Sequence, residues 1–146
     1  MITPHQIKSM KSKQKIVMLT AYDYPTAELM DDIVNIILVG DSLGMVVLGY
    51  ENTTKVTMED MARATGAVAR AVKNALIVGD MPIGTYDNEA DALKNANLLL
   101  KAGANAVKIE NKPEIAEFLV KNGIDVMGHI GLTPQTITNF KVQGKN

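Results

Sequence analysis

The sequence predicts an α/β fold of the (β/α)8 TIM-barrel type, of which this chain holds about the first five β/α units. Short apolar runs alternate with helical segments about five times along the 146 residues, which is the pattern of a parallel sheet. Three of these runs lead into an acid, at Asp41, Asp80 and Glu110. The acids are 39 and 30 residues apart, and a barrel of about 250 residues uses roughly 31 per unit. We therefore expect residues 1–146 to be the N-terminal part of a single barrel domain, with the C-terminal strands absent.

The first part of the chain contains two predicted strands, each preceded by a helix. Thr3 and Pro4 suit the N-cap and first turn of a short helix, which we expect to cover the bottom of the barrel. The connection over residues 41–54 is too long for a simple turn, and long loops in compact domains are often functional. The elements that lie between are a strand over 16–20, a helix over 25–33 and a strand over 36–39.

The second part of the chain repeats the alternation three more times. Thr57 is a suitable N-cap, with acids in the following turn, for a helix that runs to about Val72. Gly103 and Gly123 each follow a helical segment, and glycine at this place commonly ends a helix. The other predicted elements are a strand over 75–79, a helix over 88–102, a strand over 104–109, a helix over 113–122 and a strand over 125–129.

Composition argues against several classes of function. The hydrophobic share is 47% but aromatic residues supply only 4%, so the core is aliphatic, as in strands covered by helices. The net charge is −1, and no basic stripe carries aromatic residues, so nucleic-acid binding is not expected. The absence of cysteine excludes disulfides and a thiol nucleophile. No segment resembles a secretion signal or reaches transmembrane length, so we expect a cytoplasmic protein without a membrane partner.

The three acids predict a metal site. Strands of a parallel barrel carry their chemistry at their carboxyl ends, so Asp41, Asp80 and Glu110 should meet at one mouth. Three carboxylates repel each other unless a cation lies among them. A hard divalent ion with oxygen ligands is the natural occupant, and we expect Mg²⁺.

Lys108 lies two residues before Glu110 on one predicted strand, so both side chains should share a face and point into the barrel mouth. The alternative is an internal ion pair without any catalytic role. With Asp41 and Asp80 at the same level, we favour a functional role in which the lysine balances the acids and holds a substrate carboxylate.

Other polar residues stand at the same level as the acids. Ser42 follows Asp41 and could donate to a carboxylate or simply cap a turn. His129 ends the fifth predicted strand and could hydrogen-bond to a substrate, although a lone histidine on a strand is more often structural. Tyr22 and Asp23 end the first strand, and nothing in the sequence fixes their role.

Four motifs occur in order along nearly the whole chain: TAYDY at 20–24, LVGDSLG at 38–44, AGAN with VKIE at 102–110, and GHIGLTPQ at 128–135. Together they resemble the ketopantoate hydroxymethyltransferase family, also called 3-methyl-2-oxobutanoate hydroxymethyltransferase. The resemblance implies a barrel that uses Mg²⁺ to transfer a one-carbon unit from a 5,10-methylene-tetrahydropterin, such as methylene-tetrahydrofolate, to 3-methyl-2-oxobutanoate. The product is 2-dehydropantoate (ketopantoate), in pantothenate and coenzyme A biosynthesis, and the family forms a homo-oligomer, a decamer.

The resemblance also implies roles for individual residues. Asp41, Asp80 and Glu110 correspond to the metal shell. The residues that correspond to keto-acid binding are Asp41, Ser42, Asp80, Lys108 and His129. A 2-oxo acid can chelate Mg²⁺, which then stabilises the enolate formed when the C3 proton leaves. The proton acceptor of the family is a glutamate on a later strand, expected beyond Asn146, so no catalytic base is assigned within this chain.

Three alternatives remain open. A Mg²⁺-dependent enolate carbon–carbon lyase or phosphonomutase on a related barrel would also place acids at strand ends, but its cysteine-bearing loop has no counterpart in a chain without cysteine. The chain could instead be an inactive truncated fragment, which titration with metal and keto acid would reveal. A doubly wound nucleotide-binding domain is disfavoured because no G-x-G-x-x-G follows the first strand.

Overall fold

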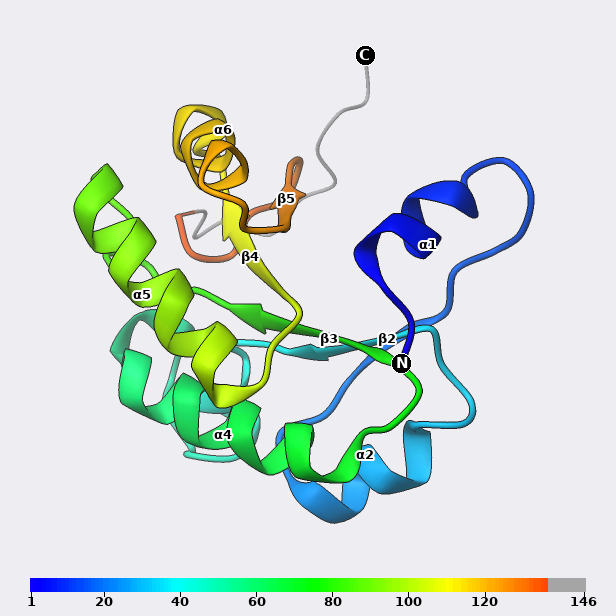
Figure 1. Ribbon diagram of the computed structural model, residues 1–146. Helices are drawn as coiled ribbons and strands as arrows, with labels where there is room; N and C mark the ends of the chain where they lie inside the picture. The colour runs from blue at the N-terminus through cyan, green and yellow to red at the C-terminus, as the bar shows by residue number, and fades with distance from the viewer. Residues whose placement is uncertain (137–146) are drawn as a thin grey trace.

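The computed structural model describes residues 1–136, in which five parallel strands alternate with helices (Figure 1). The strands pair in chain order, and each pair is parallel. The elements are α1 (Pro4–Ser9), β1 (Met18–Thr20), α2 (Tyr24–Met30), β2 (Ile36–Val39), α3 (Leu43–Val46), η1 (Thr53–Lys55), α4 (Met58–Ala71), β3 (Leu76–Asp80), α5 (Glu89–Ala102), β4 (Ala106–Glu110), α6 (Pro113–Lys121) and β5 (Val126–His129). The predicted parallel α/β fold is confirmed.

The two faces of the sheet carry different apolar clusters because side chains alternate along a strand. The outward cluster includes Ile37, Ile77 and Val107, which are fully buried. Figure 1 shows helices α2, α4, α5 and α6 wrapped around this side of the sheet. The inward cluster is smaller and contains Ile36, Leu76, Val78 and Ala106. This arrangement is one side of a barrel wall, with helices outside and the barrel interior on the other face.

Helix α1 lies on the inner side of the sheet, away from the other helices (Figure 1). Thr3 and Gln6 form a capping box, which confirms the predicted helix start. Ile2 and Ile7 pack against the inward cluster, whose members Ile36, Leu76 and Ala106 begin their strands. The helix therefore covers the end of the sheet opposite Asp80 and Glu110, which supports the expected covering role.

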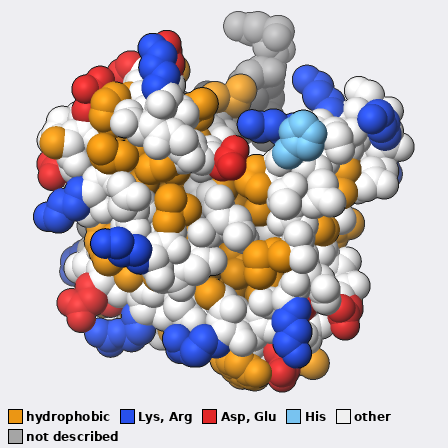
Figure 2. Space-filling model, in the orientation of Figure 1, with side chains coloured by type: hydrophobic (Ala, Val, Ile, Leu, Met, Phe, Trp, Pro, Cys, Tyr) orange, Lys and Arg blue, Asp and Glu red, His pale blue; other side chains and the backbone are white. Residues whose placement is uncertain are grey.

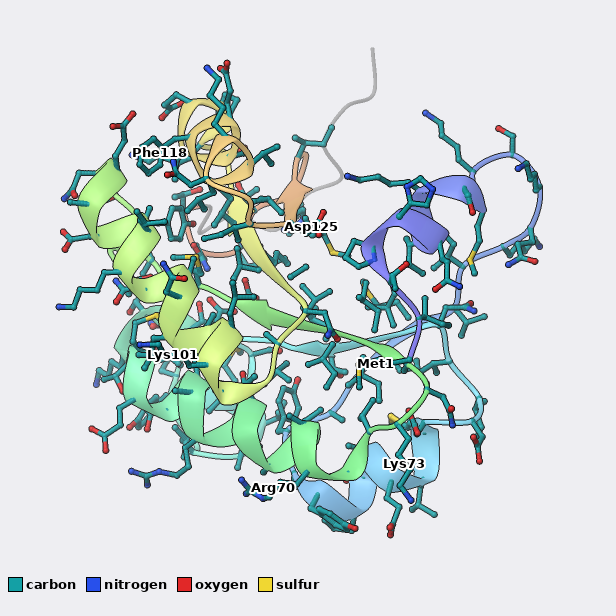
Figure 3. The ribbon with its side chains drawn as sticks, in the orientation of Figure 1. Met1, Arg70, Lys73, Lys101, Phe118 and Asp125 are labelled. Carbon is teal, nitrogen blue, oxygen red and sulfur yellow. The ribbon has the colours of Figure 1, made fainter. Side chains whose placement is uncertain are left out.

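A second contact joins α1 to the sheet. Lys8 lies 3.7 Å from Asp125, which precedes β5 and faces α1 in Figure 3. A hollow of about 180 Å³ remains between α1 and the inner face, lined by apolar side chains that include Val78 and Met127. Hydrophobic surface is also visible across the centre of Figure 2. The inner face is thus only partly covered by the described residues.

Local sequence signals set the ends of the longer helices. Thr57 and Asp60 form a capping box at the start of α4, and Asn88 caps α5 through the backbone N–H of Asp91. Gly103 ends α5 with φ of 113°, in the left-handed region that favours glycine. A Cβ at Gly103 would also collide with Ala69 of α4. Glycine is therefore required here by both backbone conformation and helix packing.

Several predicted bounds differ from the structure by one to three residues. The helix predicted over 25–33 is Tyr24–Met30, and the strand predicted over 104–109 is Ala106–Glu110. The first strand covers Met18–Thr20 and not residues 16–20, because it lies at the sheet edge and pairs only with β2. The connection over 41–54, which was expected to be longer than a simple turn, contains the short helix α3 and the beginning of η1. None of the helices in the described part of the chain has the length and apolar character needed to cross a bilayer.

Candidate active site at the carboxyl ends of the strands

Five predicted site residues meet at the carboxyl ends of β2 to β5. Asp41 follows β2, Asp80 ends β3 and Glu110 ends β4, and all three are nearly inaccessible to solvent. The strand register sets Asp80 beside Lys108, and Glu110 beside His129. Parallel pairing in chain order therefore brings together side chains that are up to 88 residues apart in the sequence.

Lys108 is the cation among these acids. Its Nζ lies 2.9 Å from both carboxylate oxygens of Asp80 and 3.4 Å from Oε1 of Glu110. Lys108 and Glu110 therefore point to the same side of β4, as predicted, while Val107 and Ile109 pack with the outer core. The internal ion pair considered as an alternative is present, and Asp80 is its closer acid.

Burial disfavours the charged form of both aspartates. Burial raises the pKa of Asp80 to about 6; the positive charge of Lys108 opposes this rise, and the negative charge of Asp41 adds to it. Burial also raises the pKa of Asp41, against a hydrogen bond from Gln135 and the charge of Lys108. Burial alone would lower the pKa of Lys108, but the neighbouring acids, with Asp80 first, raise it above its ordinary value. The positive charge of Lys108 therefore does not fully compensate the negative charge of the buried acids.

His129 contacts Glu110 through a defined ring nitrogen. Nδ1 of His129 lies 2.8 Å from Oε1 of Glu110. A carboxylate accepts hydrogen bonds, so this contact assigns the ring proton to Nδ1. With Nδ1 on Glu110, Nε2 on the far side of the partly exposed ring points away from that carboxylate.

Ser42 is held by Tyr22. The two hydroxyl groups lie 2.8 Å apart, and the Ser42 side chain makes no capping hydrogen bond to α3. A Cβ at Gly40 would lie 2.9 Å from Oγ of Ser42, so a side chain there would push this hydroxyl out of its position. The sequence left the role of Tyr22 undecided, and the structure pairs it with Ser42. Asp23 has a local role instead, since it caps α2 through the backbone N–H of Thr26.

Sequence reasoning assigned no role to Gln135 or Tyr86. The Gln135 side chain donates from Nε2 to Oδ2 of Asp41 at 2.9 Å. The Tyr86 hydroxyl donates to Oε1 of Gln135. Gln135 stands in the GHIGLTPQ motif and Tyr86 in the loop after β3, but no local pattern indicates either contact.

A third residue that the sequence did not single out is Thr53, in the long connection that was expected to be functional. Its buried hydroxyl lies close enough to the Asp41 carboxyl to lower the pKa of that group, against the larger effect of burial. Thr53 therefore adds a polar neighbour to Asp41 from the long connection.

The donor set fits a hard divalent cation. Asp41, Asp80 and Glu110 offer carboxylate oxygens, which Mg²⁺ prefers, and the backbone N–H of Asp41 lies 3.3 Å from Oδ2 of Asp80, so these two acids adjoin. Within residues 1–136 no three acidic, histidine or cysteine side chains are already arranged around a metal position. In the structure Lys108 contacts Asp80 and Glu110, and Gln135 contacts Asp41. The assignment of metal ligands therefore stays a prediction.

Together the fold and the site define a parallel α/β protein of the barrel type with an acidic site at the strand ends. The family model for ketopantoate hydroxymethyltransferase matches residues 1–146. The chain belongs to the ketopantoate hydroxymethyltransferase family.

Individual relatives agree with the family match. The 3-methyl-2-oxobutanoate hydroxymethyltransferase of Ignicoccus hospitalis is 54% identical over 147 residues, which cover 95% of this chain and 56% of that protein. The enzyme of the same name from Pyrobaculum neutrophilum is 59% identical over 143 residues, covering 92% and 55%. The Clostridium botulinum (Langeland) enzyme of that name is 55% identical over 154 residues, covering 99% and 56%. The chain spans about half the length of the curated relatives it matches.

Solved structures support the fold. Oxaloacetate acetylhydrolase superposes with a TM-score of 0.64 at 10% identity, over 87% of this chain and 52% of that one. A 2,3-dimethylmalate lyase, a member of the PEP mutase/isocitrate lyase superfamily, gives 0.62 at 13% identity, over 88% and 51%. At such low identity these similarities show the fold alone.

Proposed function

We propose that this chain supplies the metal-binding and keto-acid-binding part of a 3-methyl-2-oxobutanoate hydroxymethyltransferase. The reaction would transfer a hydroxymethyl group from a methylene-tetrahydropterin to 3-methyl-2-oxobutanoate, giving ketopantoate. The observation that carries the proposal is the single hydrogen-bonded cluster of Asp41, Asp80, Lys108, Glu110 and His129 in a chain of this family. The proposal places residues 1–146 in the N-terminal part of one barrel domain.

Asp41 and Asp80 would hold Mg²⁺, with Glu110 as the third acid of the shell. When bound, the metal supplies positive charge that stabilises negative charge developing on the oxygens of a 2-oxo acid. The raised pKa values of Asp41 and Asp80 support this assignment, because a cation beside them removes the electrostatic penalty of two buried carboxylates. Neutralisation by Lys108 alone leaves the cluster short of positive charge.

Lys108 would exchange partners when the substrate arrives. Its ammonium group lies between Asp80 and Glu110, so a lysine released from Asp80 would move only a short distance. The released charge would then be available to the substrate carboxylate. Because Glu110 stays within reach of Lys108, the lysine keeps an acidic partner during this exchange.

Ser42 and His129 would orient the substrate from the two sides of the site. The Tyr22 hydroxyl fixes the Ser42 hydroxyl, and Glu110 fixes the tautomer of His129. Both groups are then already oriented towards substrate oxygens, so binding does not require a further loss of side-chain freedom. By resemblance, the glutamate that accepts the C3 proton lies beyond Asn146, so the proposed roles of these residues are binding and positioning.

We further propose a cytoplasmic enzyme that forms a homo-oligomer and uses methylene-tetrahydrofolate or a related pterin as the one-carbon donor. Family membership supports this setting for the protein. The lyase alternative has only structural neighbours at low identity in its favour, and these concern the fold.

Calorimetry with Mg²⁺ and 3-methyl-2-oxobutanoate tests the proposal. The chain should bind the keto acid more tightly in the presence of Mg²⁺, and Asp80→Asn should weaken Mg²⁺ binding more than about tenfold, since it removes a ligand. Lys108→Met should weaken the keto acid more than the metal. The exposed Asp87, whose Oδ1 lies 3.6 Å from Nζ of Lys112, provides the matched control Asp87→Asn. Equal Mg²⁺ affinity in the wild-type chain and Asp80→Asn would contradict the assignment.

A further inference from the structure

Gln135 connects the ends of three strands. It is buried, with 4% of its surface exposed, and Nε2 donates to Oδ2 of Asp41 and to the carbonyl oxygen of Met81, each at 2.9 Å. Its backbone N–H also donates to Oε2 of Glu110 at 3.3 Å. One residue from the turn after β5 thus touches the residues that follow β2 and β3 and the acid that ends β4.

Tyr86 fixes the direction in which the Gln135 amide points. The Tyr86 oxygen accepts from the backbone N–H of Glu110 at 3.3 Å, so its own proton is directed at Oε1 of Gln135. The other side of the amide faces Asp41 and the Met81 carbonyl, which are both acceptors. A flipped amide would place its oxygen against two acceptors and its NH₂ against a donated proton. The network therefore permits one orientation only.

We propose that Gln135 is a positioning residue, which holds the carboxylates of Asp41 and Glu110 for metal binding and has its own orientation set by Tyr86. The identity of the metal rests on the proposed function. The consequence is that Gln135 sets the affinity of the site for Mg²⁺ without binding the metal itself. Partners of this kind orient the ligands of many metal sites, and their loss typically weakens metal binding by about 10–100-fold.

The turn that carries Gln135 has a separate anchor, which provides a matched control. Nδ2 of Asn111 donates to Oγ1 of Thr133 at 2.7 Å, and Thr133 is fully buried. Thr133→Val keeps the shape but removes this hydrogen bond, two residues from Gln135 and without touching either carboxylate. It therefore perturbs the same turn without altering the amide.

The first test is a calorimetric titration of the 146-residue chain with Mg²⁺. Gln135→Met keeps most of the side-chain volume and should weaken binding about 10–100-fold. Tyr86→Phe should weaken binding less, because Asp41 and Met81 still favour the correct amide direction. The Mg²⁺ affinity of Thr133→Val should stay within about twofold of the wild-type value, even if urea unfolding shows this variant to be as destabilised as Gln135→Met. Equal losses in Thr133→Val and Gln135→Met, or unchanged binding in Gln135→Met, would overturn the proposal.

The second test does not depend on the metal. In ¹⁵N NMR spectra of the metal-free chain, the Gln135 side-chain N–H signals should exchange slowly with solvent and shift in Asp41→Asn. The exposed Asn97 amide, which donates to the Leu93 carbonyl, is the reference whose signals should not shift. If the wild-type chain binds no Mg²⁺, the metal of the proposed function is wrong, and these signals alone decide whether Gln135 holds Asp41. Exchange as fast as that of Asn97 would contradict the proposal.

Discussion

Asp31 is predicted to be a main determinant of stability, although it lies outside the candidate active site. It follows α2 and is buried, and its two carboxylate oxygens accept from the backbone N–H groups of Lys73, Asn74 and Ala75 at 2.8–3.0 Å. These residues connect α4 to β3, and Lys73 is visible in Figure 3 beside α2. One carboxylate therefore ties a helix to the start of a central strand.

The Asp31→Asn substitution tests the size of this effect. The asparagine keeps one acceptor oxygen but turns the other position into a donor that faces backbone N–H groups. Hydrogen bonds to a charged group contribute about 1.5–3 kcal/mol each, so the loss of about two of them lowers the free energy of unfolding by roughly 3–6 kcal/mol. A loss of that size is a large part of the about 5–15 kcal/mol that stabilises a typical domain.

The effect should depend on pH in a defined direction. Burial alone would raise the pKa of Asp31, but the hydrogen bonds from Ala75, Lys73 and Asn74 outweigh it and lower the pKa below its ordinary value of 3.8. The stabilisation is therefore complete above pH 3.8 and is lost as the pH falls towards the lower pKa of the folded state. The difference between wild type and Asp31→Asn should be largest near neutral pH and shrink below about pH 4.

Urea unfolding monitored by circular dichroism, repeated between pH 3 and 7, measures the loss in the free energy of unfolding and its dependence on pH. Asp32→Asn is the matched control, because Asp32 is the next residue, is exposed and accepts only from the Asn74 side chain among the described residues. It should change the free energy of unfolding by about 0.5 kcal/mol or less. Equal effects of the two substitutions, or a difference that does not vary with pH, would refute the reasoning.

Two further predictions concern packing and association. Gly103→Ala should destabilise the chain by more than about 1 kcal/mol, because it combines a left-handed φ with a collision against Ala69. The control for urea unfolding is Gly123→Ala, which also has a left-handed φ but whose Cβ meets no atom within 4 Å. Equal losses of stability in the two variants would contradict a contribution from the collision. Residues 1–146 prepared by themselves should self-associate, because β1 and β5 lie at the edges of the described sheet and Met18 and Leu19 on β1 are exposed. They should also form no measurable ketopantoate, because the family resemblance assigns the proton acceptor to none of these residues. Light scattering and an assay of ketopantoate formation check both parts, and an active, monodisperse monomer would contradict them.

Local sequence signals determined most of the elements of this protein. Capping residues such as Thr57 and the helix-ending Gly103 act on backbone groups within a few residues, so their effect can be read without tertiary contacts. The run Ile36–Val39 is a strand with the predicted bounds. The two-residue period of a strand also places Lys108 and Glu110 on one face. The position of the acids at the strand ends then predicted where the candidate site lies.

The contacts that complete the site came only from the tertiary structure. The ammonium group of Lys108 lies closest to Asp80, on the neighbouring strand, because the register of β3 and β4 is set by the packing of whole elements. Gln135 reaches Asp41 across 94 residues of sequence, and Asp31 binds a loop more than 40 residues away. No periodicity or local propensity encodes such pairs, since they form only after several β/α units have packed together. The sequence by itself determined which residues could form the site, and the tertiary structure decided which of them hold one another in place.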